Sequence, residues 1–147
     1  MLELVIVRYL HFIAVFAIVG AIFAEQFLVS KNMSRKEIKQ ISKIDAIYGF
    51  GALLVLFAGL ILWFTVGKPA QYYSRNWIFH AKLTMFVVLG LLSIYPTVFF
   101  MKNRKGSDLD TQISVPGSVI LLLRIEILII IIMPILATYM SLGYGAF

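Results

Sequence analysis

Four long apolar stretches constrain the fold of this chain more than any other feature. They cover approximately residues 4–29, 46–66, 77–101 and 116–140. A bilayer core about 30 Å thick is crossed by roughly 20 apolar residues of helix, so each stretch is long enough to span it. The sequence therefore predicts an all-α transmembrane four-helix bundle with up-down-up-down topology. In this interpretation residues 1–147 form a single membrane domain.

The composition excludes several other classes of protein. Hydrophobic residues make up 61% of the chain and charged residues only 14%, whereas soluble domains have about 45–50% apolar and about 25% charged residues. A water-soluble enzyme and a disordered tail are therefore excluded. The chain has no cysteine, which excludes thiolate catalysis and cysteine-ligated clusters.

The basic residues lie mainly in two of the three connections between the apolar stretches. The first and third connections hold eight lysines and arginines, the second holds two, and the C-terminal tail holds none. Basic connections stay on the cytoplasmic side of a membrane. We therefore expect a basic cytoplasmic loop at 30–44, with the N- and C-termini on the outer side of a bacterial inner (plasma) membrane. The net charge of +6 is then a topology signal, and the expected partner is the lipid bilayer and not nucleic acid.

The segment from Ser34 to Glu37 has the form of a helix-capping box, in which a serine and a glutamate three residues later satisfy each other's backbone amides. It predicts a short basic helix that runs to Lys43 at the membrane surface. Two interpretations of this helix are open. It anchors the chain on anionic lipid, or it docks a partner protein.

Ionisable side chains inside a membrane are costly and are functional candidates by default. Eight lie in or near the apolar stretches, namely Arg8, His11, Glu25, Asp45, His80, Lys82, Arg124 and Glu126. A rise of about 1.5 Å per residue sorts most of them into two layers. The outer layer contains the histidines and Lys82, and the inner layer contains Glu25 and Glu126 with Arg124.

Helical spacing indicates which of these groups face the interior of the bundle. Arg8, His11 and Glu25 share one stripe of the first helix. His80 and Lys82 are two residues apart and therefore point in nearly opposite directions. We expect Lys82 to face inward and His80 to lie at the rim.

Arg124 and Glu126 have the same two-residue separation on the fourth helix. We expect Glu126 to face inward and Arg124 to pair with Glu25 or with a backbone carbonyl. We expect Asp45, like Glu25 and Arg124, to have either a structural role or a role in a relay. Tyr95 precedes Pro96, whose ring frees a carbonyl in the preceding turn, and it is expected to donate a hydrogen bond into the inner layer.

His11 has two interpretations. It is a neutral imidazole hydrogen-bonded to a neighbouring helix, or it is an axial ligand to haem or copper, since neutral imidazole is the commonest metal ligand. In the second case haem b is the expected cofactor and copper the alternative. Arg8, His80 and Lys82 would then meet the haem propionates, and Tyr95 would belong to the same cofactor site.

Four motifs carry a resemblance to known proteins: RYLHF at 8–12, DAIYG at 45–49, FHAKL at 79–83 and LSIYPT at 92–97. The chain resembles an uncharacterised bacterial family of four-helix integral membrane proteins. More distantly, it is similar to HemJ-type protoporphyrinogen oxidases and to CopD-like membrane proteins.

The HemJ resemblance implies specific roles for three residues. His11 would be the haem ligand, and Lys82 and Glu126 would be the catalytic lysine and glutamate. It also implies b-type haem and a membrane oxidoreductase that acts on a porphyrin. A membrane redox partner is a separate expectation.

Three functions follow from these observations. The first is a haem-binding membrane redox protein. The second is a protein that transports or handles a small solute, protons or copper, with Glu25, Asp45 and Glu126 as carriers of charge. The third is a non-catalytic accessory subunit, in which the buried polar groups only fix helix register. A homo-oligomer is compatible with each function.

Overall fold

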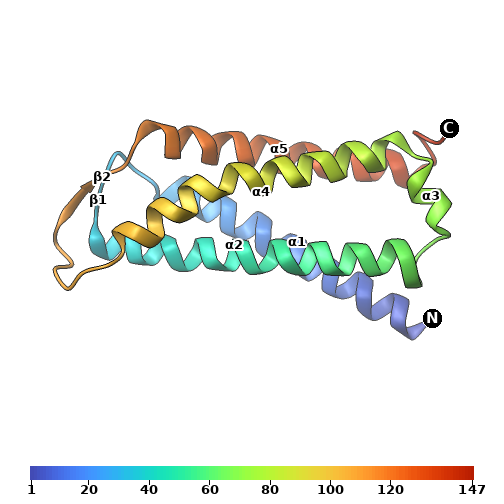
Figure 1. The fold of residues 1–147 in the computed structure, drawn as a ribbon, viewed down its shortest axis with the longest axis horizontal. Helices are drawn as coiled ribbons and strands as arrows, with labels where there is room; N and C mark the ends of the chain where they lie inside the picture. The colour runs from blue at the N-terminus through green and yellow to red at the C-terminus, as the bar shows by residue number, and fades with distance from the viewer.

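The computed structural model describes residues 1–147 and is dominated by four long helices that run side by side (Figure 1). These helices are α1 (Leu2–Leu28), α2 (Arg35–Ile61), α4 (Trp77–Asn103) and α5 (Gly117–Ser141). A π-helical turn, η1 (Leu62–Val66), continues α2, and the short helix α3 (Ala70–Ser74) follows it. All four long helices have the length and hydropathy of membrane spans. The predicted all-α four-helix membrane bundle is therefore confirmed.

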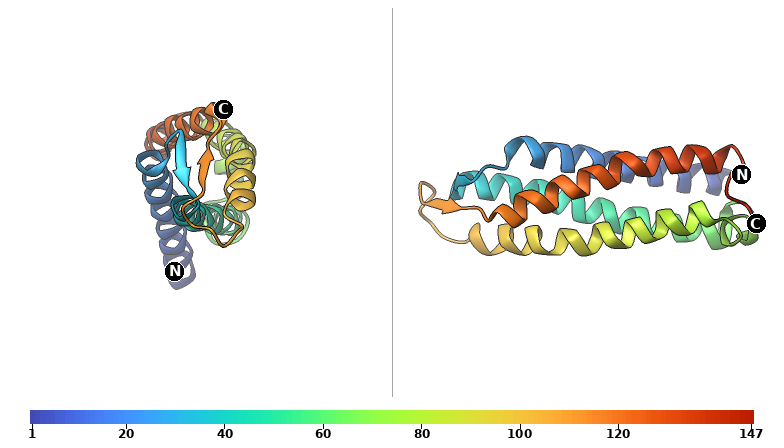
Figure 2. Two further views of the ribbon diagram at one scale, coloured as in Figure 1. Left: turned by 90° about the vertical axis from the view of Figure 1, so that its left-hand side faces the viewer. Right: turned by 90° about the horizontal axis from the view of Figure 1, so that it is seen from above.

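The four helices form a ring in which each neighbours two others. Helix α1 lies between α2 and α5, and α4 lies on the opposite side of the ring, also between α2 and α5 (Figure 2). The chain alternates in direction from one span to the next, so both termini lie at one end of the bundle (Figure 1). We call the half of the bundle near the termini the termini-side half, and the half near the strands β1 and β2 the loop-side half.

The capping box was predicted correctly, but the helix that it starts is longer than expected. The Ser34 hydroxyl accepts a hydrogen bond from the amide of Glu37 at 3.3 Å, and the Glu37 carboxylate accepts one from the amide of Ser34 at 2.7 Å. From there α2 continues without a break to Ile61. The predicted surface helix to Lys43 and the predicted span from 46 are therefore parts of one continuous helix, and the basic residues of the first connection after Ser34 lie in its first three turns.

The first and third connections pair with each other, which the sequence did not indicate. Strand β1 (Asn32–Ser34) is antiparallel to β2 (Gln112–Ser114), with Met33 opposite Ile113. Beyond the strands, the Arg35 guanidinium donates a hydrogen bond to the Asp108 carbonyl at 2.8 Å. The strand pairing and this hydrogen bond close the loop-side end of the bundle.

The termini-side end is held by a different contact. The buried side chain of Asn76 donates a hydrogen bond to the Tyr144 carbonyl at 2.9 Å and accepts one from the Ile78 amide at 3.0 Å. The amide of Phe147 donates to the Arg75 carbonyl at 3.1 Å. These bonds tie the C-terminal tail to the start of α4.

The apolar core lies mainly in the loop-side half. Its most deeply buried members include Ile22, Ile38 and Phe100, each 0% exposed. No residue of α1 before Ala14 is buried, and Figure 1 shows this end of α1 leaving the other helices. The buried polar side chains of the spans therefore gather where the helices pack most closely.

Candidate functional site

Three carboxyl side chains from three different helices are buried in the loop-side half. They are Glu25 of α1, Asp45 of α2 and Glu126 of α5, which are 1%, 5% and 1% exposed. They lie close enough that the charges of Asp45 and Glu126 act on Glu25. We call these three residues the carboxyl cluster.

Helical periodicity explains why these acids face one another. Glu25 lies seven residues after the buried Ile18 and three after the buried Ile22, which keeps it on the inward stripe of α1. Glu126 likewise follows the buried Leu123 on α5, and Asp45 follows the buried Ser42 on α2. Each acid therefore lies on the face of its helix that packs into the interior of the bundle.

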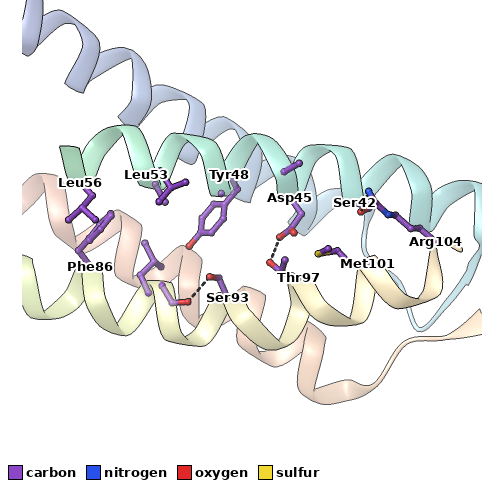
Figure 3. A pocket seen from close by; sticks show the side chains of 15 residues that line it. Ser42, Asp45, Tyr48, Leu53, Leu56, Phe86, Ser93, Thr97, Met101 and Arg104 are labelled. Atoms are coloured by element: carbon purple, nitrogen blue, oxygen red, sulfur yellow. Dashed lines mark hydrogen bonds between the residues drawn. The ribbon is translucent and has the colours of Figure 1, made fainter. Parts of the chain in front are cut away.

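Hydroxyl groups surround the carboxyl cluster. The Thr97 hydroxyl of α4 donates a hydrogen bond to Asp45 Oδ1 at 3.0 Å. The buried Tyr48 side chain extends from α2 toward Ser93 of α4 (Figure 3), and its hydroxyl lies near the Glu126 carboxyl. All four spans thus contribute polar groups at one level of the bundle.

Several of these buried atoms have no hydrogen-bond partner. They are Glu25 Oε1, Glu126 Oε1 and the Tyr48 hydroxyl. A polar group removed from water costs free energy unless it is hydrogen-bonded, and an isolated buried charge costs much more. Buried acids in this arrangement are suited to accept a proton or a mobile ligand.

A groove between α2 and α4 leads to the carboxyl cluster. It has a volume of about 460 Å³, and both Asp45 and Tyr48 line it (Figure 3). Gly49 and Ala52 on α2 and Gly90 on α4 also line the groove, where their small side chains leave space between the helices. Asp45 therefore connects the cluster to a surface that faces the surrounding lipid.

The polar atoms of the three side chains in the carboxyl cluster are all oxygens. No three histidine, aspartate or glutamate side chains converge closely enough to hold a metal ion. Carboxyl and phenol oxygens can, however, both accept and release protons. The chemistry that this site supports best is therefore proton exchange.

His11 and Lys82 lie apart from the carboxyl cluster, in the termini-side half. The His11 ring is half-buried against α2, where its Cε1 would be 3.9 Å from a methyl group added at Gly59. Its Nδ1 is buried and has no hydrogen-bond partner. The half-buried Lys82 lies near enough for its charge to act on the ring. The two side chains thus form a second polar pair, as their shared outer layer predicts.

The remaining candidates for the cofactor site are on the surface. Arg8 is exposed, and so is His80, whose Nε2 lies 2.8 Å from the Ser74 carbonyl oxygen. Tyr95 is 48% exposed. Its side chain therefore faces the membrane, and the structure does not place it with His11.

One expected pairing is absent, and the two residues to which the HemJ resemblance assigns catalytic roles lie apart. Arg124 does not pair with Glu25, because it lies two residues from the inward-facing Glu126 and is exposed on the other side of α5. Lys82 lies five residues inside one end of the bundle and Glu126 nine residues inside the other, so about 15 Å of helix separates their levels. These two residues do not share one site.

Sequence reasoning did not identify Tyr48, Ser93 and Thr97 as site residues. A usable signal was present for Tyr48, which follows Asp45 by three residues and therefore shares its helix face. The two hydroxyl residues of α4 gave no such signal, because serine and threonine are common in membrane helices.

Comparison with curated proteins found no match, and comparison with solved structures found none either. One family model matches nearly the whole chain, over residues 3–145, and its description is "Predicted membrane protein (DUF2214)". Because this match covers all four spans and the carboxyl cluster, the chain belongs to the DUF2214 family of membrane proteins.

Proposed function

We propose that this protein translocates protons across the membrane through the carboxyl cluster. The observation that carries the proposal is the burial of three carboxyl groups from three spans, with Glu25 Oε1 and Glu126 Oε1 left without partners. Ionisable groups inside a bundle mark proton relays when they face one another and not the lipid. The bacterial inner membrane, which maintains a proton gradient, is the proposed location.

The order of the groups suggests a route. Asp45 is the one acid of the cluster that lines the groove. The Tyr48 hydroxyl lies beside Glu126, and a phenol can accept one proton while it donates another. Glu25 completes the cluster on α1, and His11 and Lys82 are the next titratable groups toward the termini.

Proton flux into proteoliposomes under an imposed potential tests this proposal. The wild-type protein should acidify the lumen faster than protein-free liposomes do. Glu126→Gln keeps the shape of the side chain but removes its titration, and it should lower the flux toward that of protein-free liposomes.

Glu37→Gln is the matched control, because Glu37 is exposed and lies on α2 outside the cluster. Its flux should equal that of the wild type. A flux that is unchanged in Glu126→Gln, or a wild-type flux equal to that of empty liposomes, overturns the proposal.

A second candidate function, haem binding, is favoured by one observation, the buried and unpartnered Nδ1 atom of the half-buried His11 ring. A neutral imidazole nitrogen can ligate haem iron, and Lys82 is near enough to meet a propionate. His11 lines neither the groove between α2 and α4 nor the pocket at the loop-side end of α1 and α5, so a porphyrin ligated by His11 would lie outside both. Bound haem would supply electron-transfer chemistry. An absorption spectrum with a Soret band that His11→Ala abolishes supports this candidate, and a colourless protein from haem-supplied cells excludes it.

A further inference from the structure

A second hollow, separate from the groove, lies at the loop-side end of the bundle. It has a volume of about 350 Å³ and is formed by the C-terminal end of α1, the residues that follow it, and the N-terminal turns of α5. Lys31 and Arg124 both line it, and both are exposed. No acidic residue lines it. Two positive charges thus face one hollow without a negative charge among its walls.

The same hollow contains further donors of hydrogen bonds. The amide nitrogen of Gln26, Nε2, is buried and has no partner. Helix α5 begins in the wall of the hollow at Gly117, and no side chain caps its first amides. The N-terminus of a long helix carries a partial positive charge and binds anions. Together with Lys31 and Arg124, these groups are suited to a phosphate.

The walls of the hollow also include an apolar part. Ile120 and Leu121 lie one turn into α5, and Leu121 is 58% exposed toward the membrane. The hollow therefore offers cations and amide donors at one side and an apolar surface at the other, at the end of a membrane span. A ligand that matches both parts has a phosphate and an acyl chain.

We propose that this hollow binds the headgroup phosphate of an anionic phospholipid, with Lys31 and Arg124 as its cationic ligands. A zwitterionic phospholipid fits less well, because no acidic side chain in the hollow would meet its ammonium group. The proposal does not depend on proton translocation.

Lipid retention by the full-length protein, measured by native mass spectrometry, tests the proposal. The probe is an equimolar mixture of phosphatidylglycerol and phosphatidylcholine in the detergent. The wild type should retain phosphatidylglycerol preferentially. The double variant Lys31→Gln/Arg124→Gln should bind it about thirtyfold more weakly. Each basic side chain near an anionic surface contributes about 1 kcal/mol, and the loss of about 2 kcal/mol from the pair corresponds to that factor at tenfold per 1.4 kcal/mol.

The matched control is Lys102→Gln/Lys105→Gln, which removes the same charge from the third connection without touching the hollow. It should retain phosphatidylglycerol as the wild type does. Because Lys31 and Arg124 are both exposed, the double variant should keep its helical circular dichroism, and the single variant Lys31→Gln gives an independent measurement with a smaller loss.

Three outcomes overturn the proposal. They are equal retention of the two lipids, equal losses in the double variant and in the control, and complete displacement of phosphatidylglycerol by inorganic phosphate. The last result would assign the hollow to a free anion instead of a lipid.

Discussion

The two halves of the bundle differ in how deeply their polar side chains are buried. In the loop-side half, α1, α2 and α5 close around Glu25, Asp45 and Glu126, and the pairing of β1 with β2 covers the end. In the termini-side half, the first turns of α1 leave the ring, and no residue before Ala14 is buried. His11 there is only half-buried.

This difference shows that the depth of a residue along the membrane normal and its burial within the protein are separate properties. Both halves lie within the spans, and both contain ionisable groups. Only the half with closely packed helices buries carboxyl groups. Ionisable groups that face the interior of a bundle are the ones that proton relays use. The other half leaves its histidine and lysine near a surface where a ligand could enter from the bilayer.

The largest expected effect is the loss of stability when a buried phenylalanine is replaced by alanine, compared with the same change at an exposed phenylalanine. Phe100, in the loop-side half, is 0% exposed, and Phe16 on α1 is 68% exposed. Phe100→Ala should lower the free energy of unfolding by about 3 kcal/mol, because it leaves a cavity in the core. Phe16→Ala should change it by less than about 1 kcal/mol, because lipid replaces the ring. Unfolding by SDS in mixed micelles measures both, and equal losses would contradict the difference between the halves.

Two glycines on α2 test how closely α1 and α2 pack against each other. A methyl group at Gly51 would lie 3.0 Å from Ile18 Cγ1 and 3.3 Å from the Ala14 carbonyl oxygen, whereas one at Gly49 meets nothing within 4 Å. Gly51→Ala should therefore destabilise the bundle by about 2 kcal/mol through overpacking. Gly49→Ala should be neutral or slightly stabilising in the same assay. A neutral Gly51→Ala would show that α1 and α2 are not closely packed there.

The smallest expected effect compares the two helix caps at opposite ends of the bundle. Asn76 is buried and holds both the start of α4 and the Tyr144 carbonyl, so Asn76→Ala should cost about 2 kcal/mol. Ser34→Ala should cost about 1 kcal/mol, since the strand pairing beside it remains. Hydrogen exchange at the Phe147 amide should accelerate only in the Asn76 variant. Acceleration in the Ser34 variant would contradict the independence of the two ends.

Much of the fold could be predicted because membrane helices follow from length and hydropathy. The third span was expected from 77 and begins at Trp77, and the fourth was expected from 116 and begins at Gly117. The capping box at Ser34 was also predicted, because its two hydrogen bonds join residues only three positions apart. Local interactions of this kind can be inferred from sequence alone.

The parts that were missed depend on contacts between distant residues. Strands β1 and β2 have three residues each and show no alternating pattern, and they lie about 80 positions apart in the chain. The hydrogen bond from Thr97 to Asp45 likewise joins two spans. Arg124 was assigned to Glu25 from a shared layer, but the direction that it takes around α5 depends on the packing of Glu126.

The central claim is that the buried carboxyl groups of the cluster change protonation state while the protein functions. Infrared difference spectroscopy of the reconstituted protein between acidic and neutral pH reports this most directly, through the carbonyl stretch of protonated carboxyl groups. The account predicts carboxyl bands that disappear in Glu25→Gln and Glu126→Gln and persist in Glu37→Gln. Difference spectra that are identical in all three variants and the wild type would contradict it.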